Sequence, residues 1–277
     1  LPSTYYQLLT TYYKLPTNML YPLKFSPILK DKIWGGTKLK SLFDKPAVTD
    51  RLGESWELSG YEGDESIVTN GFLAGNNLVE LIEIYMGELI GDTLFDEFGL
   101  SFPLLFKLID ANENLSIQVH PGDEVAAERH NSFGKTEMWY VVNADPGSEL
   151  IIGFTDCSRE TYLDAMAEDK VEDLLQKVPV TKGDVFFIPA GRVHAIGKGV
   201  VVAEIQQSSD ITYRIYDYKR KDDNGNEREL HTEQALDVID FEASKQPKAV
   251  YTPLLNETTP LITCNYFTTN MLRFNKQ

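Results

Sequence analysis

The chain contains 277 residues, with 26 lysines and arginines against 42 aspartates and glutamates, and its formal net charge at pH 7 is −16. Nucleic acids and anionic membranes are bound through a basic face, so this balance excludes a general binder of either class. Hydrophobic residues make up 42% of the sequence. Since no continuous run of about eighteen apolar residues occurs, we expect a globular protein without a transmembrane helix.

The first patterned element follows a segment of uncertain role. Residues 1–18 are rich in tyrosine, threonine and leucine, and they lack the basic start and continuous apolar stretch of a signal peptide. We interpret them as an N-terminal extension that ends before Met19. The first helix is expected at 77–90, because Asn77 is a suitable N-cap and apolar residues follow it at helical spacing.

The remaining elements are three helices and many short strands. Helices are expected at 122–130, 158–176 and 231–239, and Ser158 is the N-cap of the second. β-Branched and aromatic residues between turn residues predict strands. These strands are expected at 104–110, 115–119, 137–143, 149–154, 184–188, 200–206 and 211–218. Many short strands with regular turns favour a sandwich or a barrel.

The last part of the chain changes in character. The charged segment 219–230 is expected to form an exposed hairpin tip around Asn224 and Gly225. Residues 246–260 contain three prolines and are interpreted as a linker. A new strand pattern begins at Leu261. Since 261–277 is too short to form a domain, we expect it to be the truncated start of a second module.

The strongest chemical signal is the segment GDVFFIPAGRVH at 183–194. Gly183 suits a tight turn into a strand, and Pro189 and Gly191 suit a bend that leaves the strand ladder. That bend would direct His194 inward, where an imidazole can bind a metal ion. The alternative is an ordinary hairpin with an incidental histidine.

Two other segments place polar residues two positions apart, which puts them on one face of a strand. LSIQVHP at 115–121 pairs Gln118 with His120, and GKTEMWYV at 134–141 pairs Lys135 with Glu137. Together with His194, these segments offer a ligand set for a divalent ion that leaves positions open for substrate or water. The alternative for each pair is a solvated strand surface.

A single arginine stands out in the segment EIQQSSDITYRIYDY at 204–218. Arg214 is flanked by Tyr213 and Tyr216, and its planar fork suits a phosphate or an enolate-type anion. The alternative is a cross-strand surface pair with Asp210 or Asp217.

These motifs together resemble a known family. Segment 183–194 resembles the second cupin motif, Gly-x5-Pro-x-Gly-x2-His. The first cupin motif normally reads His-x-His followed closely by Glu, whereas here Gln118-x-His120 precedes a distant Glu137. This departure resembles the type I phosphomannose isomerases, zinc enzymes of the cupin superfamily, in their compact bacterial form. Supporting segments are FSPILKDKIWGG at 25–36, GESWELSG at 53–60, PLLFKLIDANENLSIQVHP at 103–121 and SSDITYRIYDY at 208–218.

The resemblance implies a mostly β fold, the cupin double-stranded β-helix or jelly-roll barrel, with a few helices. The implied organisation is a catalytic cupin domain at 19–245, a linker at 246–260 and the truncated start of a C-terminal cupin domain at 261–277. It also implies a cytoplasmic enzyme of mannose metabolism, a monomer or weak homodimer, that binds a sugar phosphate and neither nucleic acid nor membrane.

The resemblance also implies the site. One zinc ion per chain would be held by Gln118, His120, Glu137 and His194. The surrounding cavity would contain Trp34, Glu54, Lys107, Ser116, Lys135, Glu204, Asp210 and Arg214. The implied reaction interconverts mannose 6-phosphate and fructose 6-phosphate.

Such an isomerisation moves a proton between adjacent sugar carbons through an enediol. It needs a Lewis acid, a base and an anchor for the phosphate. Arg214 is expected to stabilise an anion, either the phosphate or the enediolate, while Glu204 and Lys135 remain alternatives for the base. The competing hypothesis is a non-catalytic metal-binding cupin that recognises a sugar, although a plain sugar binder would not need Arg214 and Lys135 beside the metal.

Overall fold

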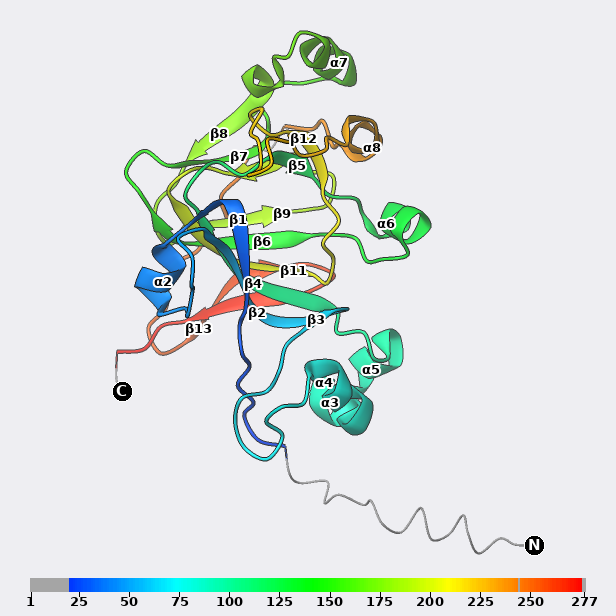
Figure 1. Ribbon diagram of the computed structural model, residues 1–277, viewed down its shortest axis with the longest axis vertical. Helices are drawn as coiled ribbons and strands as arrows, with labels where there is room; N and C mark the ends of the chain where they lie inside the picture. Colours follow the sequence, from blue (N-terminus) through cyan, green and yellow to red (C-terminus); the bar gives the residue numbers. More distant parts are fainter. Residues whose placement is uncertain (1–19, 244, 276–277) are drawn as a thin grey trace, which may run out of the picture.

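The computed structural model describes residues 20–243 and 245–275, so the expected extension at 1–18 lies outside the described residues. Two antiparallel sheets face each other and form a barrel (Figure 1). The larger sheet has the order β1 (Ile28–Gly36), β2 (Leu52–Tyr61), β4 (Leu104–Ala111), β11 (Val200–Gln207), β6 (Glu137–Ala144) and β9 (Val185–Ile188), and β3 (Asp64–Glu65) pairs with β2. The smaller sheet has the order β12 (Tyr213–Tyr216), β5 (Ile117–Val119), β10 (His194–Ile196), β7 (Glu149–Phe154) and β8 (Leu175–Pro179). The expected mostly β architecture is confirmed.

The main core fills one end of the space between the two sheets. It joins Trp139 and Phe186 of the larger sheet to Ile152 and Ile196 of the smaller sheet, and all four side chains are buried. Burying apolar side chains of this size is the dominant favourable term in folding. The other end of the same space is lined by polar side chains, and it forms the candidate site described below.

Five strands of the two barrel sheets were not predicted from the sequence: β1, β2, β3, β8 and β10. In β1 and β2 the positions that face the interior include the charged residues Lys32 and Glu54, which line the polar cavity. Because the usual signal of a strand is apolar alternation, inward-facing charges conceal it. These two strands lack the simple pattern because they carry part of the polar site.

The expected single helix at 77–90 is wrong in its second half. The capping box predicted at Asn77 is present, and α3 runs from Leu78 to Tyr85. Met86 then has a φ of 49°, which ends the helix, and α4 (Gly87–Ile90) and α5 (Asp92–Phe98) follow as separate turns. A methionine in the left-handed region is unfavourable on its own, so tertiary packing imposes this break.

The expected helix at 158–176 is also too long. Ser158 caps α7 (Arg159–Ala167) as predicted, with its hydroxyl accepting from the amide of Thr161 at 3.1 Å. The chain then turns at Asp169, forms a short 3-10 helix at Val171–Leu174 and continues as strand β8. The other expected helices are confirmed as α6 (Asp123–His130) and α8 (Thr232–Val238).

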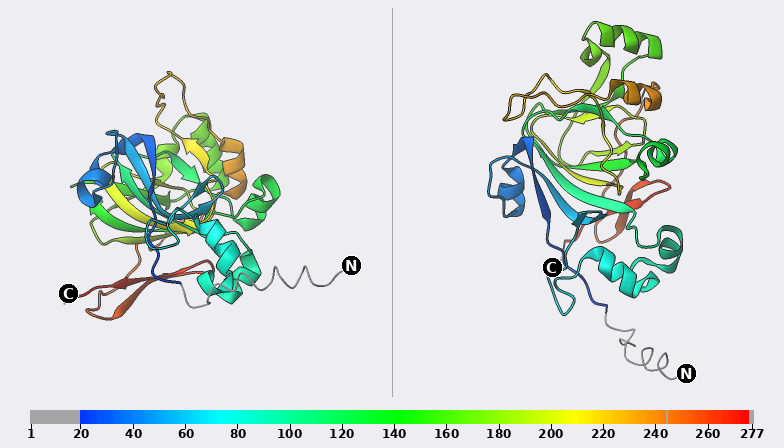
Figure 2. Two further views of the ribbon diagram at one scale, coloured as in Figure 1. Left: turned by 60° about the horizontal axis from the view of Figure 1, so that its bottom comes forward. Right: turned by 45° about the vertical axis from the view of Figure 1, so that its right-hand side comes forward.

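The C-terminal segment forms a hairpin beside the larger sheet. Strands β13 (Thr258–Thr263) and β14 (Thr268–Leu272) pair with each other, and Phe267 packs against Met138 and Val185 on the outer face of that sheet (Figure 2). Strand β13 begins inside the expected linker at 246–260 and includes Pro260, which a terminal, two-stranded ribbon tolerates. That this hairpin begins a second cupin domain stays a prediction.

The described helices lie on the outside of the barrel. Helix α2 (Lys38–Phe43) covers part of the outer face of the larger sheet, where Leu39 packs on Leu52 and Val201. Among the described helices, none has both the length and the apolar character needed to cross a membrane.

Candidate active site

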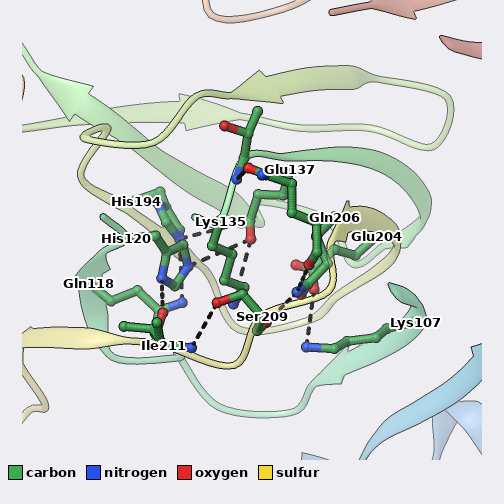
Figure 3. Close-up of polar contacts among 12 residues, drawn as sticks. Lys107, Gln118, His120, Lys135, Glu137, His194, Glu204, Gln206, Ser209 and Ile211 are labelled. Atoms are coloured by element: carbon green, nitrogen blue, oxygen red, sulfur yellow. Dashed lines mark hydrogen bonds and ion pairs between the residues drawn. The ribbon is translucent and has the colours of Figure 1, made fainter. Parts of the chain in front are cut away.

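Three buried side chains meet at the inner end of the polar cavity, and each comes from the edge of a strand. His120 directly follows β5, Glu137 begins β6 and His194 begins β10 (Figure 3). The Nε2 atoms of the two histidines are 3.1 Å apart, and the carboxylate oxygens of Glu137 lie 3.6 Å from His120 Nε2 and 3.4 Å from His194 Nε2. All three side chains are about 1% exposed. Their ligand atoms lie within 4.8 Å of one another, as a metal site requires.

Backbone carbonyls determine which ring nitrogen carries the hydrogen in each of the two imidazoles. His120 Nδ1 lies 2.8 Å from the carbonyl of Ile211, and His194 Nδ1 lies 2.8 Å from the carbonyl of Arg192. A carbonyl can only accept, so each Nδ1 carries the hydrogen and each Nε2 keeps its lone pair. Burial lowers the pKa of His194 to about 3 and that of His120 well below its usual value. Both rings are therefore neutral at pH 7, the form that binds a metal.

The surroundings of Glu137 indicate a binding site for a cation. Both of its carboxylate oxygens are buried, and neither has a hydrogen-bond partner among the residues that the structure describes. Burial raises the pKa of Glu137 to about 8, although the Lys135 ammonium lies 3.7 Å away. A buried carboxylate without partners is costly. Two oxygens facing two imidazole lone pairs therefore fit a divalent metal ion that accepts nitrogen and oxygen ligands.

Gln118 lies next to this cluster and links it to the neighbouring strand. It is directly opposite His194 on β10 and directly opposite Arg214 on β12, so the three residues form one row across the smaller sheet. Its amide nitrogen lies 3.3 Å from His194 Nε2, and its amide oxygen accepts from the Ser116 hydroxyl at 3.2 Å. Turning the amide by 180° exchanges its two ends, so its oxygen can join the metal ligands while the Ser116 hydroxyl becomes the acceptor.

Gln118 and Lys135, which contact this cluster, line a polar cavity of about 260 Å³. The structure brings all the remaining predicted site residues to its wall: Trp34, Glu54, Lys107, Ser116, Lys135, Glu204, Asp210 and Arg214. One detail of the prediction is wrong, since Lys135 precedes β6 and does not share a strand with Glu137. A larger groove lies on the outside of β6 and β11 beside the C-terminal hairpin, but its described lining lacks a histidine and carboxylate cluster.

Paired charges line the wall formed by the larger sheet. Lys107 Nζ lies 3.5 Å from Glu204 Oε1, and Glu204 Oε2 accepts from Trp139 Nε1 at 2.8 Å. Burial lowers the pKa of Lys107, but Glu204 and Glu54 outweigh it and raise this pKa above its usual value. Burial likewise raises the pKa of Glu54, but the charges of Lys107 and Lys32 prevail and bring it to about 2. Both groups are therefore charged at neutral pH.

The loop after β11 completes the site. The buried amide of Gln206 donates to the carbonyls of Gln207 and Ser209, at 2.8 and 2.6 Å. These contacts hold the loop that carries Asp210 to the cavity and the Ile211 carbonyl to His120 (Figure 3). Sequence reasoning named Asp210 but not the supporting glutamine.

Charged or aromatic residues of the site that were also missed from the sequence include Lys32, Trp56 and Arg228. Lys32 and Trp56 bind Glu54 at 3.2 and 2.7 Å. Both lie two positions from a named site residue, Trp34 or Glu54, so strand alternation could have indicated them. Arg228 lies beyond the hairpin tip, where no local pattern distinguishes it from its charged neighbours.

Comparison with known proteins points to one family. The model of the type I phosphomannose isomerase catalytic domain matches residues 22–162. Mannose-6-phosphate isomerase of Streptococcus mutans is 41% identical over 251 residues, which cover 90% of this chain and 78% of that protein. Mannose-6-phosphate isomerase ManA of Bacillus subtilis is 40% identical over 252 residues, covering 89% and 77%.

A solved structure agrees with the sequence comparison. The crystal structure of the mannose 6-phosphate isomerase from Bacillus subtilis matches with a TM-score of 0.81 and 35% identity, covering 90% of this chain and 79% of that one. The expected cupin barrel is thereby confirmed. The chain belongs to the type I phosphomannose isomerase family.

Proposed function

We propose that this protein interconverts mannose 6-phosphate and fructose 6-phosphate with the help of one zinc ion per chain. The observation that carries the proposal is the buried cluster of His120, Glu137 and His194 at the inner end of a cavity that is also lined by cations. Relatives that are about 40% identical over most of the chain bear the name of this enzyme. The donor set and the resemblance support zinc.

The four ligands in this proposal are Gln118, His120, Glu137 and His194. Two neutral imidazoles, one carboxylate and one amide oxygen suit a borderline divalent ion and leave room for substrate. When bound, zinc supplies Lewis-acid polarisation of a substrate oxygen. The chain itself fixes the imidazoles through the carbonyls of Ile211 and Arg192.

We assign the proton transfer to Glu204. Its Oε1 is buried without a hydrogen bond to any described residue, whereas its Oε2 is fixed by Trp139. A base needs a free lone pair on an atom held in position, and the side chain of Glu204 provides one at the cavity wall. Lys135 Nζ lies 3.7 Å from Glu137, at the end of the cavity next to the proposed metal ligands. Lys135 is therefore assigned to stabilising the negative charge that develops on the substrate.

The other named lining residues bind and orient the substrate. Lys107 and Glu54 present buried charges, and Ser116 and Asp210 present shorter polar groups, which suit the hydroxyls of a sugar. Trp34 supplies an apolar wall. Arg214 is assigned to anion binding through its fork. Cations in this number distinguish the proposed enzyme from a cupin that merely binds a neutral sugar.

The test is conversion of mannose 6-phosphate by the purified chain. We expect fructose 6-phosphate to form, and we expect unphosphorylated mannose to be a much poorer substrate because it cannot use the cations. Binding of the sugar phosphate without any conversion would favour the non-catalytic alternative. Absence of both binding and conversion would contradict both hypotheses.

A further inference from the structure

Arg228 lines the polar cavity together with Arg214, although 13 intervening residues form a surface excursion between them. Arg214 lies on β12, and the chain then runs out through the turn at Asp222–Asn226 and returns. The returning segment is bound to Arg214. The Arg214 guanidinium donates to the Glu229 carbonyl at 2.8 Å, and the Arg214 backbone amide donates to His231 Nδ1 at 3.2 Å. These contacts bring Arg228 back to the cavity.

Asp217 holds Arg228 in one orientation. The Asp217 carboxylate is buried and accepts from Nε and Nη2 of Arg228, at 2.7 and 2.6 Å. This two-point contact fixes the plane of the guanidinium. Nη1 of Arg228 has no protein acceptor among the hydrogen bonds of the described residues, and the side chain is 26% exposed. A ligand in the cavity can therefore reach a guanidinium that is already oriented.

Guanidinium groups outnumber buried carboxylates at this end of the cavity. At the other end, Lys107 is paired with Glu204, Lys32 with Glu54 and Lys135 with Glu137. Asp210 also acts there, because its charge helps to raise the pKa of Lys107 against the effect of burial.

At the arginine end, the Asp217 carboxylate is shared by Arg228 and Arg220. Burial lowers the pKa of Arg214, and the nearby charges of Arg228 and Arg220 lower it further. Asp217 and Glu229 are the carboxylates whose charges act on Arg214 and oppose this lowering, and Glu229 is the more exposed of the two. Three guanidiniums are thus close to one buried carboxylate, which pairs with two of them, in a protein whose net charge is −16. A local surplus of this kind suits a dianionic ligand group.

We propose that Arg214 and Arg228 together form the subsite for the phosphate group of the substrate, with Asp217 as the positioning residue for Arg228. The inference rests on the proposed function. The reacting carbons of the sugar are C1 and C2, whereas the phosphate is on C6, so the phosphate must bind away from the metal ligands. Lys135 Nζ lies 3.7 Å from the Glu137 carboxylate and is therefore at the reacting end. Arg214 pairs with Gln118 through the backbone of β12 and β5, but its guanidinium extends to the Glu229 carbonyl, on the segment that carries Arg228.

The test is replacement of Arg228 by Gln and by Lys in the zinc-loaded protein. We expect Arg228→Gln to raise the KM for mannose 6-phosphate roughly tenfold to a hundredfold, with little change in kcat, because it removes one charge-assisted contact. Arg228→Lys should recover part of the loss, since it keeps the charge without the fork. The control Arg129→Gln removes the same charge from an exposed surface pair with Asp237, and its KM should not change.

Calorimetry with inorganic phosphate gives a readout that does not depend on turnover. Arg228→Gln should weaken phosphate binding by a factor similar to its effect on KM. Asp217→Asn should raise KM without lowering kcat; a lower kcat at unchanged KM would overturn its positioning role. Unchanged KM and unchanged phosphate binding in Arg228→Gln would overturn the subsite. If the unmodified protein binds phosphate through Arg228 but converts no mannose 6-phosphate, the proposed function fails while the anion subsite stands.

Discussion

Lys107 and Glu204 lie directly opposite each other on β4 and β11, and their charged atoms are 3.5 Å apart inside the barrel. Both side chains are almost fully buried. A buried ion pair is seldom the most stable solution, since apolar residues of similar volume often serve as well or better. Its presence at the wall of a polar cavity therefore indicates a functional requirement, and the pair holds the Glu204 carboxylate in place.

The first prediction concerns the base. Glu204→Gln should lower kcat by about a hundredfold to ten-thousandfold, because it removes proton acceptance and keeps the shape of the side chain. The zinc content should remain that of the unmodified protein. The most specific measurement is exchange of the C2 hydrogen of mannose 6-phosphate with heavy water, followed by NMR. This exchange should be lost in Glu204→Gln.

Lys135→Met is the matched variant. It should slow turnover by weakening charge stabilisation, yet it should still exchange the C2 hydrogen. If Lys135→Met loses the exchange and Glu204→Gln retains it, then the two roles are reversed.

The second prediction concerns stability in acid. Burial raises the pKa of Glu54, but Lys107 and Lys32 bring it down to about 2, below the ordinary value of 4.5. The folded state therefore favours the ionised group, and this contribution is present above pH 4.5 and is lost as the pH falls toward 2. Its size is roughly 3 kcal/mol.

Urea unfolding as a function of pH measures this effect. Glu54→Gln should be less stable than the unmodified protein at neutral pH, and the difference should shrink as the pH falls toward 2. Glu149→Gln, which alters an exposed carboxylate on β7, serves as the control. A stability difference that stays constant from neutral pH to about pH 2 would show that the Glu54 carboxylate is not stabilised by its lysines.

The third prediction concerns the protons that metal binding displaces. Burial raises the pKa of Glu137 to about 8 in the metal-free protein, so this carboxyl is mostly protonated at pH 7. A metal binds only the ionised form, so zinc binding should release close to one proton at pH 7 and almost none well above pH 8. The two neutral histidines release none. Calorimetry in two buffers with different ionisation enthalpies measures this number, and negligible release at pH 7 would contradict the assignment of Glu137.

The site could be predicted from the sequence because its residues stand in local patterns. Gln118 and His120 are two positions apart at the end of a strand, and His194 follows a proline and glycine bend, so both placements depend on neighbouring residues alone. The family resemblance supplied Trp34, Glu54 and Lys107 as site residues. The strands of Trp34 and Glu54 carry too many inward-facing polar groups to be recognised by alternation.

The features that were missed depend on contacts between distant segments. The break at Met86 requires a left-handed backbone at a residue that disfavours it, and the close approach of Gly87 to Asp92 accompanies it. Arg228 looks like any charged residue of an exposed turn. Two contacts bring Arg228 to the cavity. The segment after the turn binds Arg214 of β12 through the Glu229 carbonyl, and Asp217 binds the Arg228 guanidinium. No local pattern in the sequence records either relationship.

The most direct test of the central claim is to measure zinc content and mannose 6-phosphate turnover on the same samples: as purified, after removal of metal with a chelator, and after zinc is added back. We predict one zinc per chain in the active protein, loss of turnover with loss of zinc, and recovery of both on reconstitution. His120→Ala should lack zinc and turnover under all three conditions, since it removes a buried ligand. Zinc-free protein that turns over mannose 6-phosphate as fast as the untreated protein would contradict the account.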